Sequence, residues 1–506
     1  MLKRLTLFIF FLLPFSFVFA QKEGDIFFAE GTVHEIRFYF AQPGYWDSLI
    51  ANKPAEIYMK GEVRVDGAVY PNSGVRFKGN SSYNNPSVKK PFKIDFEEFV
   101  PDQTHDGLKQ LSLSNGFKDP TFLREKLMLD FCNQHGIPAP RATFANLYIN
   151  YERWGLYVVV EDVGKTFLKQ RFDNNDGNLY KGEPHGLLTW KGWDQTLYEA
   201  DYELKTNETE NDWSGLIALL NTLNNTPAAQ LSDSLAARLH LDSWFGYWAV
   251  HNLFVNLDSY VGSGHNYYLY HNEDTGLFEF ITWDVNEAFG NFKMGLNLTQ
   301  IKTLPFTHIP QPFNQRPLMN RLLQDAGLKQ RLADRLCALL QDFNMEKMAP
   351  RTDALANLIR PHVQADTKKF YSNTQFEQNL TQDLSTPGGP QGPFDIAGLT
   401  SFVTARRNSL LGQLAAFGCT ATAVSQAGED NWDVFPNPVS GRIFVRDTGG
   451  TLSRIGLYTL QGQQLKTWDR SSDGVSFDLD GIAAGIYVLQ LQNREGRFTL
   501  KKIVVQ

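Results

Sequence analysis

Three polar side chains, Asp258, Asn266 and Asp284, stand beside two short aromatic segments in the middle of the chain. The segment NYYLY from Asn266 and the segment LFEFITW before Asp284 have the composition of strands, and the residues between them favour a turn. A hairpin brings the start of its first strand and the end of its second strand to the same edge. We therefore expect the three side chains to converge at one rim, where carboxylate and amide oxygens can bind a divalent cation.

The order Asp, Asn, Asp along the chain is also the order found in protein kinases. There the first Asp accepts the proton of the substrate hydroxyl, and the Asn and the second Asp hold magnesium ions on the triphosphate. Asp and Asn are also the commonest turn and cap residues. The spacing alone therefore leaves that plainer interpretation open.

Strand patterns dominate residues 31–100 and predict a twisted antiparallel sheet. The polar loop GNSSYNNPSVKK at 79–90 lies between two of these strands. Small residues in such a loop expose backbone N–H groups, and a lysine at its end can reach an anionic oxygen, as in a phosphate-binding loop. Because the sequence contains no GxGxxG or GKS motif, a simple polar hairpin loop is the alternative.

A helix is expected over about 121–135, where Leu123, Leu127 and Phe131 recur at helical spacing, followed by a strand hairpin over about 142–162. From residue 212 onward the apolar spacing is helical, and residues 370–394 have the polar, Pro/Gly-rich composition of a surface loop. A strand-rich part followed by a helix-rich part indicates an α+β fold. The polar hairpin lies at their junction, where ligands commonly bind.

The two ends of the chain carry export signals. Residues 1–20 have a basic start, an apolar stretch and a small residue at the end, which predicts a secretory signal peptide. No later segment is apolar enough to span a bilayer. Residues 419–430 are small and polar, like a linker, and residues 431–506 consist of short alternating segments that predict an independent β-sandwich.

The net charge of −7 and the absence of a long basic run argue against a nucleic-acid surface. The acidic segment 183–212 could steer basic substrates toward Asp258, or could be a solvated loop. Cys132 and Cys337 fall within helical patterns and are expected to be buried thiols, while Cys419 lies at the expected end of a domain. We expect neither a structural disulfide nor a thiolate metal site.

Several motifs in fixed order resemble the CotH kinase family, over residues 32–418: RFKGNSS, KKPFKIDF, KDPTFLREKL, YINYERWGLYVVVE, HNYYLY and TWDVNEAFG. The resemblance implies a domain, residues 21–418, with an atypical protein-kinase-like fold, a strand-rich N-lobe and a helix-rich C-lobe. It also implies transfer of the γ-phosphoryl group of ATP to Ser/Thr hydroxyls of exported or surface proteins, with Mg²⁺ or Mn²⁺. The alternative is a non-catalytic surface scaffold that keeps the fold as a binding module.

Carried over residue by residue, the resemblance makes Asp258 the catalytic residue and Asp284 a metal ligand. Asn266 matches the second metal ligand. These three assignments coincide with the residues that the hairpin pattern singles out.

The resemblance also implies residues that contact ATP. Lys90 in the KKPF segment is the first choice for the phosphate-contacting lysine, with Lys78 and Lys93 as rivals. Glu161 matches the family's acidic position after the GLY hairpin, where it could pair with a lysine or bind metal. Glu125 is the candidate for the helix glutamate of kinases.

The tail, with FPNPVSGRIFV, LYTLQGQQL and GIAAGIYVLQLQ, resembles the type A sorting domain of the type IX secretion system. This resemblance implies a Bacteroidetes-type route through the periplasm, with the type IX machinery as a partner. The mature protein would then be secreted or held on the cell surface.

Overall fold

The computed structural model describes residues 22–389, 392–420, 432–447, 452–459, 464–469, 476–493 and 498–506. The chain divides into two compact units, Met1–Thr420 and Ala421–Gln506, which are described separately. The expected signal peptide and most of the expected linker lie outside the described residues. Among those that are described, no helix combines the length and hydropathy needed to cross a bilayer.

The N-terminal part of the first unit is a closed barrel in the order β1-β2-β3-β4-β5-β7-β6. Along β1, buried side chains alternate with partly exposed ones, which follows from the two-residue repeat of a strand. The expected antiparallel sheet is present, and parallel pairing of β1 with β6 closes it into a barrel. The bounds are β1 Val33–Tyr39, β2 Met59–Val65, β3 Ala68–Phe77, β4 Phe92–Asp95, β5 Gln110–Ser114, β6 Ala142–Ile149 and β7 Glu152–Glu161.

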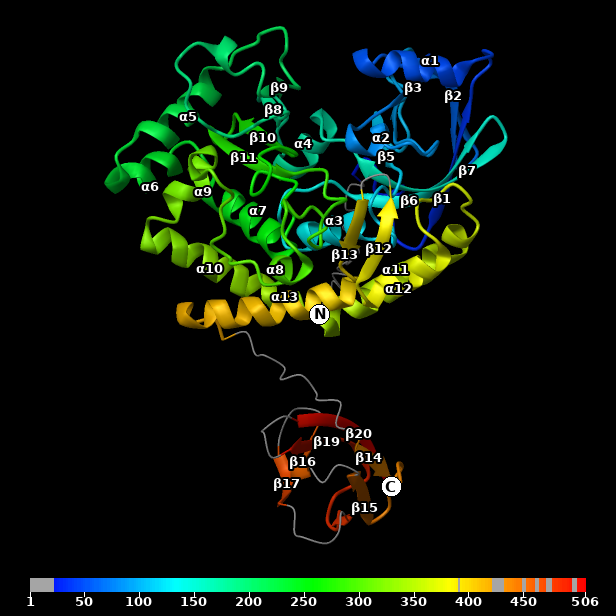
Figure 1. Cartoon of the computed structure of the whole chain (residues 1–506), viewed down its shortest axis with the longest axis vertical. Coiled ribbons are helices and arrows are strands. Elements are labelled where there is room, and N and C mark those ends of the chain that lie inside the picture. Colours follow the sequence, from blue (N-terminus) through cyan, green and yellow to red (C-terminus); the bar gives the residue numbers. More distant parts are fainter. Residues whose placement is uncertain are drawn as a thin grey trace, which may run out of the picture. The chain divides into compact units, whose positions relative to one another are not determined.

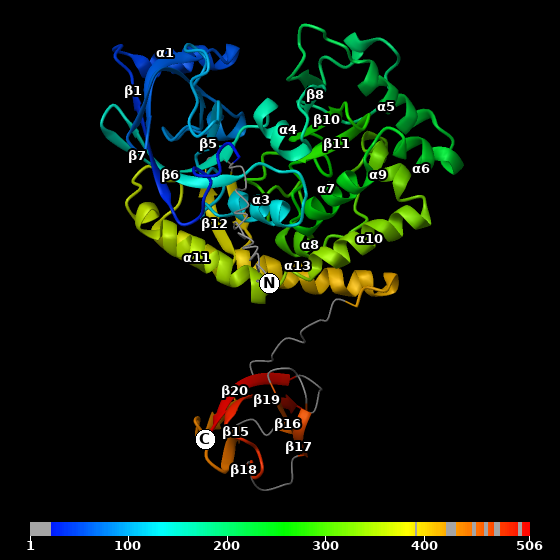
Figure 2. The same ribbon diagram turned by 180° about the vertical axis from the view of Figure 1, so that it is seen from behind.

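Helices accompany the barrel and the segments that leave it. In Figure 1, α1 crosses the top of the barrel, α3 lies between the barrel and the helical part, and α11 runs beneath the barrel. The view from behind in Figure 2 agrees on the central place of α3. The bounds are α1 Tyr45–Asn52, α2 Ser81–Asn84, α3 Arg124–Gln134 and α4 Lys165–Phe172.

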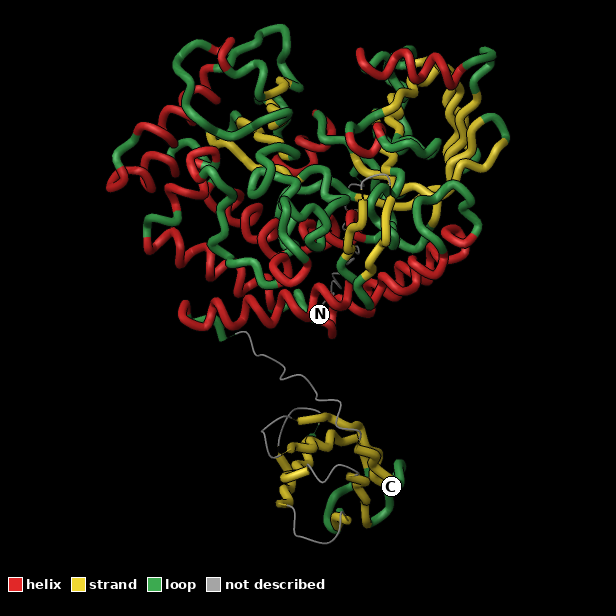
Figure 3. Tube along the Cα trace, in the orientation of Figure 1, coloured by secondary structure: helices red, strands yellow, loops and turns green. Residues whose placement is uncertain are grey.

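The C-terminal part of the first unit is rich in helix and contains a small sheet in the order β11-β10-β8-β9. Figure 3, which is coloured by secondary structure, shows yellow strands gathered in the barrel and red helices around the small sheet. The strands are β8 Leu179–Gly182, β9 Tyr202–Leu204, β10 Tyr267–Asn272 and β11 Leu277–Thr282. The helices are α5 Ser214–Asn225, α6 Ala228–Ala236, α7 Leu241–Leu253, α8 Leu298–Lys302, α9 Pro317–Leu322, α10 Ala326–Leu340, α11 Met345–Gln364, α12 Asn373–Thr381 and α13 Leu399–Leu414. The α+β class, with a strand-rich N-lobe and a helix-rich C-lobe, is confirmed.

The surface loop expected over residues 370–394 is wrong. This segment contains α12, which begins with a capping box between Ser372 and Gln375, and the hairpin strands β12 Leu384–Gly389 and β13 Gly392–Ile396. The capping side chains satisfy the first N–H groups of the helix. The Pro/Gly-rich composition of the segment did not reveal the capping pattern of Ser372 and Gln375.

The expectation of no structural disulfide is also wrong. Cys337 of α10 forms a disulfide with Cys419, just after α13, while Cys132 is a buried free thiol. The two cysteines are 82 residues apart in sequence, so no local pattern reveals their proximity. In the chain-entropy model, a crosslink that closes a loop of this length stabilises the fold by about 4 kcal/mol.

A buried ion pair joins the barrel to the helical lobe. Lys89 and Asp366 are fully buried; the Lys89 ammonium donates to the Asp366 carboxylate and to the carbonyl oxygen of Leu156 at 2.7 Å. The backbone N–H of Leu156 donates to the same carboxylate at 3.0 Å. Gly155 has a φ of 120°, and a Cβ there would overlap the Asp366 carboxylate. The glycine of the GLY hairpin is therefore required by the close approach of Asp366.

The second unit has an all-β core. Its described strands form two sheets, in the orders β14-β15-β18 and β17-β16-β19-β20, around a cluster that includes Trp432, Leu457 and Leu489. Two sheets enclosing one apolar core make a sandwich, as the tail's alternating pattern predicts. The strands are β14 Trp432–Phe435, β15 Arg442–Asp447, β16 Leu452–Tyr458, β17 Gln464–Asp469, β18 Ser476–Asp478, β19 Gly485–Asn493 and β20 Phe498–Val505.

Candidate active site

The β10–β11 hairpin brings Asn266 and Asp284 to the same end. Tyr267, the first residue of β10, pairs with Thr282, the last residue of β11, so the residues just outside the two strands share one edge. Asn266 and Asp284 have φ values of 56° and 52°, a left-handed backbone that Asn and Asp adopt more readily than most residues. This conformation turns the chain sharply at both positions.

Asp258 joins this edge from the loop that follows α7. Its backbone oxygen accepts a hydrogen bond from the Asn266 side-chain amide at 3.1 Å. The loop between them is compact, because the Ser263 N–H donates to the Leu257 carbonyl at 2.7 Å. The Asn266 side chain therefore lies against the Asp258 backbone, although seven residues separate the two in the sequence.

A histidine holds the side chain of Asp258. His265 Nε2 lies 2.7 Å from Asp258 Oδ1, and the Ser263 hydroxyl donates to the same oxygen at 3.3 Å. The pKa of His265 is raised: burial opposes its charge, but the hydrogen bond and the charge of Asp258 outweigh that effect. These contacts orient one carboxylate oxygen of Asp258.

Asp284 is a partly buried carboxylate surrounded by charges of both signs. Burial raises its pKa most, and the negative charge of Asp258 adds to the rise, while Lys78 and Lys181 oppose it. The two aspartates are therefore close enough to interact. A carboxylate buried with a like charge nearby favours a cation beside it.

Lys78, directly after β3, is the lysine that faces Asp284. Burial lowers its pKa, and the charges of Asp284 and Glu125 oppose that change. Its ammonium lies 5.2 Å from the centre of the Trp283 ring. Lys78, Glu125 and Asp284 line one small cavity, together with Gly79, Ser82, Pro91, Ser114, Asn115, Gly116, Phe117, Asp119, Val158 and Asn286.

Glu125, in the first turn of α3, completes this group. Burial, with the charge of Asp284, raises the pKa of Glu125 to about 7, while Lys78 acts in the opposite direction. A lysine at a strand end facing a helix glutamate is the arrangement of protein kinases. The glutamate suggested by the resemblance is therefore brought to the site.

Lys90, the first choice for the phosphate-contacting lysine, is not brought to this group. Its ammonium donates to the carbonyl oxygens of Tyr83, at 2.7 Å, and Asn85, at 2.5 Å, and so stabilises its own loop. The other rival, Lys93, pairs with Asp162 at 2.9 Å, beside the exit of β7. The physical reason is that β4 begins only at Phe92, so Lys90 belongs to the preceding loop and its ammonium turns back onto the carbonyl oxygens of that loop.

Glu161 is also placed differently from the expectation. It is paired with two arginines, Arg141 at 2.5 Å and Arg171 at 3.2 Å, rather than with a lysine. Its side chain is only 2% exposed, and both carboxylate oxygens accept from these guanidiniums. Glu161 therefore pairs with Arg141, just before β6, and with Arg171 of α4.

Comparison with known proteins adds the family. The model for "CotH kinase protein" matches residues 75–383, more than half of the chain and the whole of the group just described. The chain belongs to this family. The model for "Secretion system C-terminal sorting domain" matches residues 433–506, so the protein is exported, to the cell surface or beyond, and the type IX secretion machinery is the implied partner.

Among relatives of this chain, "Inner spore coat protein H" of Bacillus subtilis is 29% identical over 57% of this chain and 78% of its own length. "Spore coat protein homolog 1" of Rhizopus delemar is 25% identical over 61% of this chain and 53% of its own length. Among solved structures, the Helicobacter pylori proinflammatory kinase CtkA covers 72% of this chain with 10% identity and a TM-score of 0.26.

Sequence reasoning missed two charged residues near this candidate site, Glu287 and Lys181. Glu287, in the quoted motif TWDVNEAFG, is buried, and its two oxygens accept from Lys118 at 3.0 and 3.1 Å. Burial raises the pKa of Glu287 to about 7, with Asp258 and Asp284 contributing. Its place three residues after Asp284 was the available signal. No sequence pattern pointed to Lys181. Its charge acts on Asp284 because the pairing of β8 with β10 brings the two residues together.

The side chains of this site are better suited to a metal ion that binds together with a nucleotide than to a permanently bound metal ion. Among the described residues, no group of three or more His, Cys, Asp and Glu side chains is placed to hold a metal. Mg²⁺, however, is commonly bound by one or two carboxylates together with substrate phosphates. The Asp284 carboxylate and the Asn266 amide oxygen fit that requirement.

Proposed function

We propose that this protein is an exported atypical protein kinase that transfers the γ-phosphoryl group of ATP to Ser/Thr hydroxyls of exported or surface proteins. The observation that carries the proposal is the group of Lys78, Glu125, Asp284 and Asp258 at the junction of the two lobes. A partly buried lysine between two carboxylates, next to a further carboxylate, has no packing advantage over apolar side chains. Phosphoryl transfer needs those charges, because positioning and electrostatic stabilisation supply nearly all of its catalysis.

Lys78 would bind phosphate oxygens, and Glu125 would hold its ammonium in place. Asp284 and Asn266 would hold Mg²⁺ or Mn²⁺. The metal, when bound, neutralises charge on the phosphates. Because the left-handed backbone at Asn266 and Asp284 is fixed by the hairpin, both side chains are presented without reorganisation of the strands.

Asp258 would accept the hydroxyl proton of the substrate at its carboxylate. His265 and Ser263 occupy Oδ1, which orients the group and leaves the proton transfer to Oδ2. A general base in this position needs to lie within hydrogen-bond reach of the hydroxyl.

Within the acidic segment 183–212, the residue whose position favours steering of a substrate is Glu183, at its start. Glu183 pairs with Lys181, and its charge acts on the pKa values of Asp284 and His265, so it lies by the site. Farther along, Asp201 and Glu203 pair with Lys191 and Lys205 at 2.5 and 2.7 Å. We propose a preference for basic flanking residues that depends on Glu183. Peptide libraries differing in flanking charge would test it, and indifference to charge at low salt would refute it.

The function is tested by melting the mature protein with ATP, with and without Mg²⁺ or Mn²⁺, and by measuring transfer to Ser/Thr peptides. Asp284→Asn should abolish the metal-dependent rise in melting temperature, whereas Asp258→Asn should keep the rise and lose turnover. Asp274→Asn, at the exposed turn of the same hairpin, is the matched control and should match wild type in both assays.

The competing function is a non-catalytic scaffold, for which the fold serves only as a binding module. An unchanged melting temperature in every combination of nucleotide and metal would favour that alternative. Equal loss of nucleotide binding in the Asp258 and Asp284 variants would contradict the separate roles given to them.

A further inference from the structure

A buried arginine lies against the loop that carries Asp258. Arg316 comes directly before α9 and is only 4% exposed. Its guanidinium donates to the carbonyl oxygen of Gly262, and to that of Gln315 at 2.6 Å. The guanidinium carbon also lies 5.9 Å from the centre of the Tyr260 ring. The loop between Asp258 and Asn266 is therefore packed on a cation.

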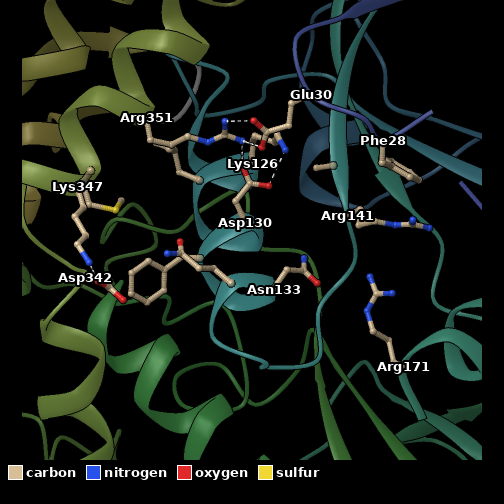
Figure 4. A pocket seen from close by; sticks show the side chains of 15 residues that line it. Phe28, Glu30, Lys126, Asp130, Asn133, Arg141, Arg171, Asp342, Lys347 and Arg351 are labelled. Atoms are coloured by element: carbon tan, nitrogen blue, oxygen red, sulfur yellow. Dashed lines mark hydrogen bonds and ion pairs between the residues drawn. The ribbon is translucent and has the colours of Figure 1, made fainter. Parts of the chain in front are cut away.

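This cation lacks the partner that arginines in this unit usually have. Figure 4 shows the usual arrangement, in which Arg351 donates to the carboxylates of Glu30 and Asp130. Among the described residues, no carboxylate forms an ion pair with Arg316, and its Nε has no hydrogen-bond partner. Burial lowers the pKa of Arg316. A buried charge without a counter-ion costs free energy, so packing alone would favour an apolar side chain here.

The contact with Gly262 fixes one peptide group of the loop. The Gly262 carbonyl belongs to the same planar peptide as the Ser263 N–H, which donates to the Leu257 carbonyl oxygen at 2.7 Å. The two polar groups of this peptide are thus held by partners on different segments of the chain. Because the peptide is planar, these two hydrogen bonds leave it little freedom to rotate.

Two glycines allow the loop to pack this closely. A Cβ at Gly262 would lie 1.8 Å from the Leu257 carbonyl oxygen, and a Cβ at Gly264 would lie 2.9 Å from the guanidinium carbon of Arg316. Gly264 also has a φ of 89°, in the left-handed region that favours glycine. The loop backbone and the guanidinium therefore meet with no room for a side chain between them.

The fixed peptide carries one of the groups that orient Asp258. The Ser263 hydroxyl donates to Asp258 Oδ1 at 3.3 Å, and His265 Nε2 lies 2.7 Å from the same oxygen. Both contacts come from the short stretch of backbone that packs on Arg316. A continuous set of contacts thus leads from the guanidinium, through the Gly262–Ser263 peptide, to the Asp258 carboxylate.

We propose that Arg316 is a positioning residue for Asp258: it fixes the Gly262–Ser263 peptide and so holds the carboxylate in the orientation that accepts the hydroxyl proton. Positioning supplies much of the catalysis of phosphoryl transfer, so a displaced base lowers turnover. The catalytic part of this inference rests on the proposed function, whereas the fixing of the loop does not. Nucleotide binding depends on Lys78 and Asp284, outside the loop, and should be retained.

The test compares Arg316→Met with Arg316→Lys in the mature protein. Lysine can still donate to the Gly262 carbonyl, whereas methionine cannot. Hydrogen exchange followed by mass spectrometry reports opening of residues 257–266, since exchange requires the N–H groups of the loop to lose their partners. We expect exchange of this segment to become at least tenfold faster in Arg316→Met and to stay near the wild-type rate in Arg316→Lys.

Steady-state transfer to a Ser/Thr peptide tests the catalytic part. Arg316→Met should lower kcat at least tenfold with little change in the KM for ATP or in the metal-dependent rise in melting temperature, and Arg316→Lys should recover most of kcat. Arg321→Met is the matched control, because Arg321 of the same helix donates to the carbonyl oxygens of Leu223 and Thr226 instead. Its loop exchange and kcat should match wild type.

Ser263→Ala tests the last contact without a buried substitution, because Ser263 is partly exposed. It should lower kcat several-fold with an unchanged melting temperature. Wild-type loop exchange in Arg316→Met, an undiminished kcat in that variant or in Ser263→Ala, or the same changes in Arg321→Met would overturn the inference. A wild-type protein that transfers no phosphoryl group would contradict the proposed function, while the exchange rates would still decide whether Arg316 fixes the loop.

Discussion

The two units of this chain bury different kinds of side chain. The first unit buries many charged residues, including Lys89, Glu125, Glu161 and Asp366. In the described part of the second unit, the buried side chains are apolar, as in the cluster around Leu457. Burying charge costs free energy that pairing only partly recovers. The unit with the proposed active site buries charged side chains despite this cost, whereas the described core of the sorting domain is built from apolar side chains, which stabilise a fold without it.

The largest expected effect concerns the two lysines of the first unit. Lys78→Met should reduce phosphoryl transfer by at least about 100-fold, since it removes the cation beside Asp284 and Glu125. Lys90→Met should stay within a few-fold of wild type, because the Lys90 ammonium donates to carbonyl oxygens of its own loop. Single-turnover kinetics on both variants would decide, and equal losses would show that the loop, rather than Lys78 alone, contacts the nucleotide.

Next is the buried ion pair between the lobes. Asp366→Asn should destabilise the first unit by about 3–5 kcal/mol, because it leaves the Lys89 charge buried without a counter-ion. Chemical denaturation followed by tryptophan fluorescence measures the loss. The double variant Lys89→Met, Asp366→Leu should recover much of it, and a double variant as unstable as the single one would contradict the argument.

The structural features described above differ in how far they could be predicted from the sequence. The β10–β11 hairpin and the sandwich of the tail follow from local alternation and turn residues, so they could be predicted. The choice between Lys78 and Lys90 could not, because it depends on where β4 begins and on how α3 packs. Barrel closure through β1 and β6, the Lys89–Asp366 pair and the Cys337–Cys419 disulfide join residues far apart in sequence, and no local pattern encodes them.

A smaller effect is expected from pH. Burial raises the pKa of Glu125 from an ordinary value near 4.5 to about 7. The unfolded chain therefore loses this proton first as pH rises, so the contribution of Glu125 to stability is full below pH 4.5 and declines until about pH 7. The loss is up to about 3 kcal/mol. Denaturation at several pH values should show that Glu125→Gln lacks this decline; parallel curves for the variant and wild type would exclude it.

The smallest effect should come from removing the sorting domain. A chain ending at Thr420 should unfold within about 0.5 kcal/mol of the first unit in the full chain, because the second unit has its own core. Calorimetry of both chains makes the comparison. The shortened protein should remain in the periplasm, and its normal delivery to the surface would contradict the role of the tail.

The Cys337–Cys419 disulfide fixes the place where the first unit ends. Cys419 is the last residue but one of that unit, and the bond ties it to α10 rather than leaving the end of α13 to fray. Disulfides of this kind form and persist in oxidising compartments. A protein that had lost its sorting domain after export would therefore remain covalently tied to α10 at Cys419, so trimming from the C-terminus would be resisted at that residue.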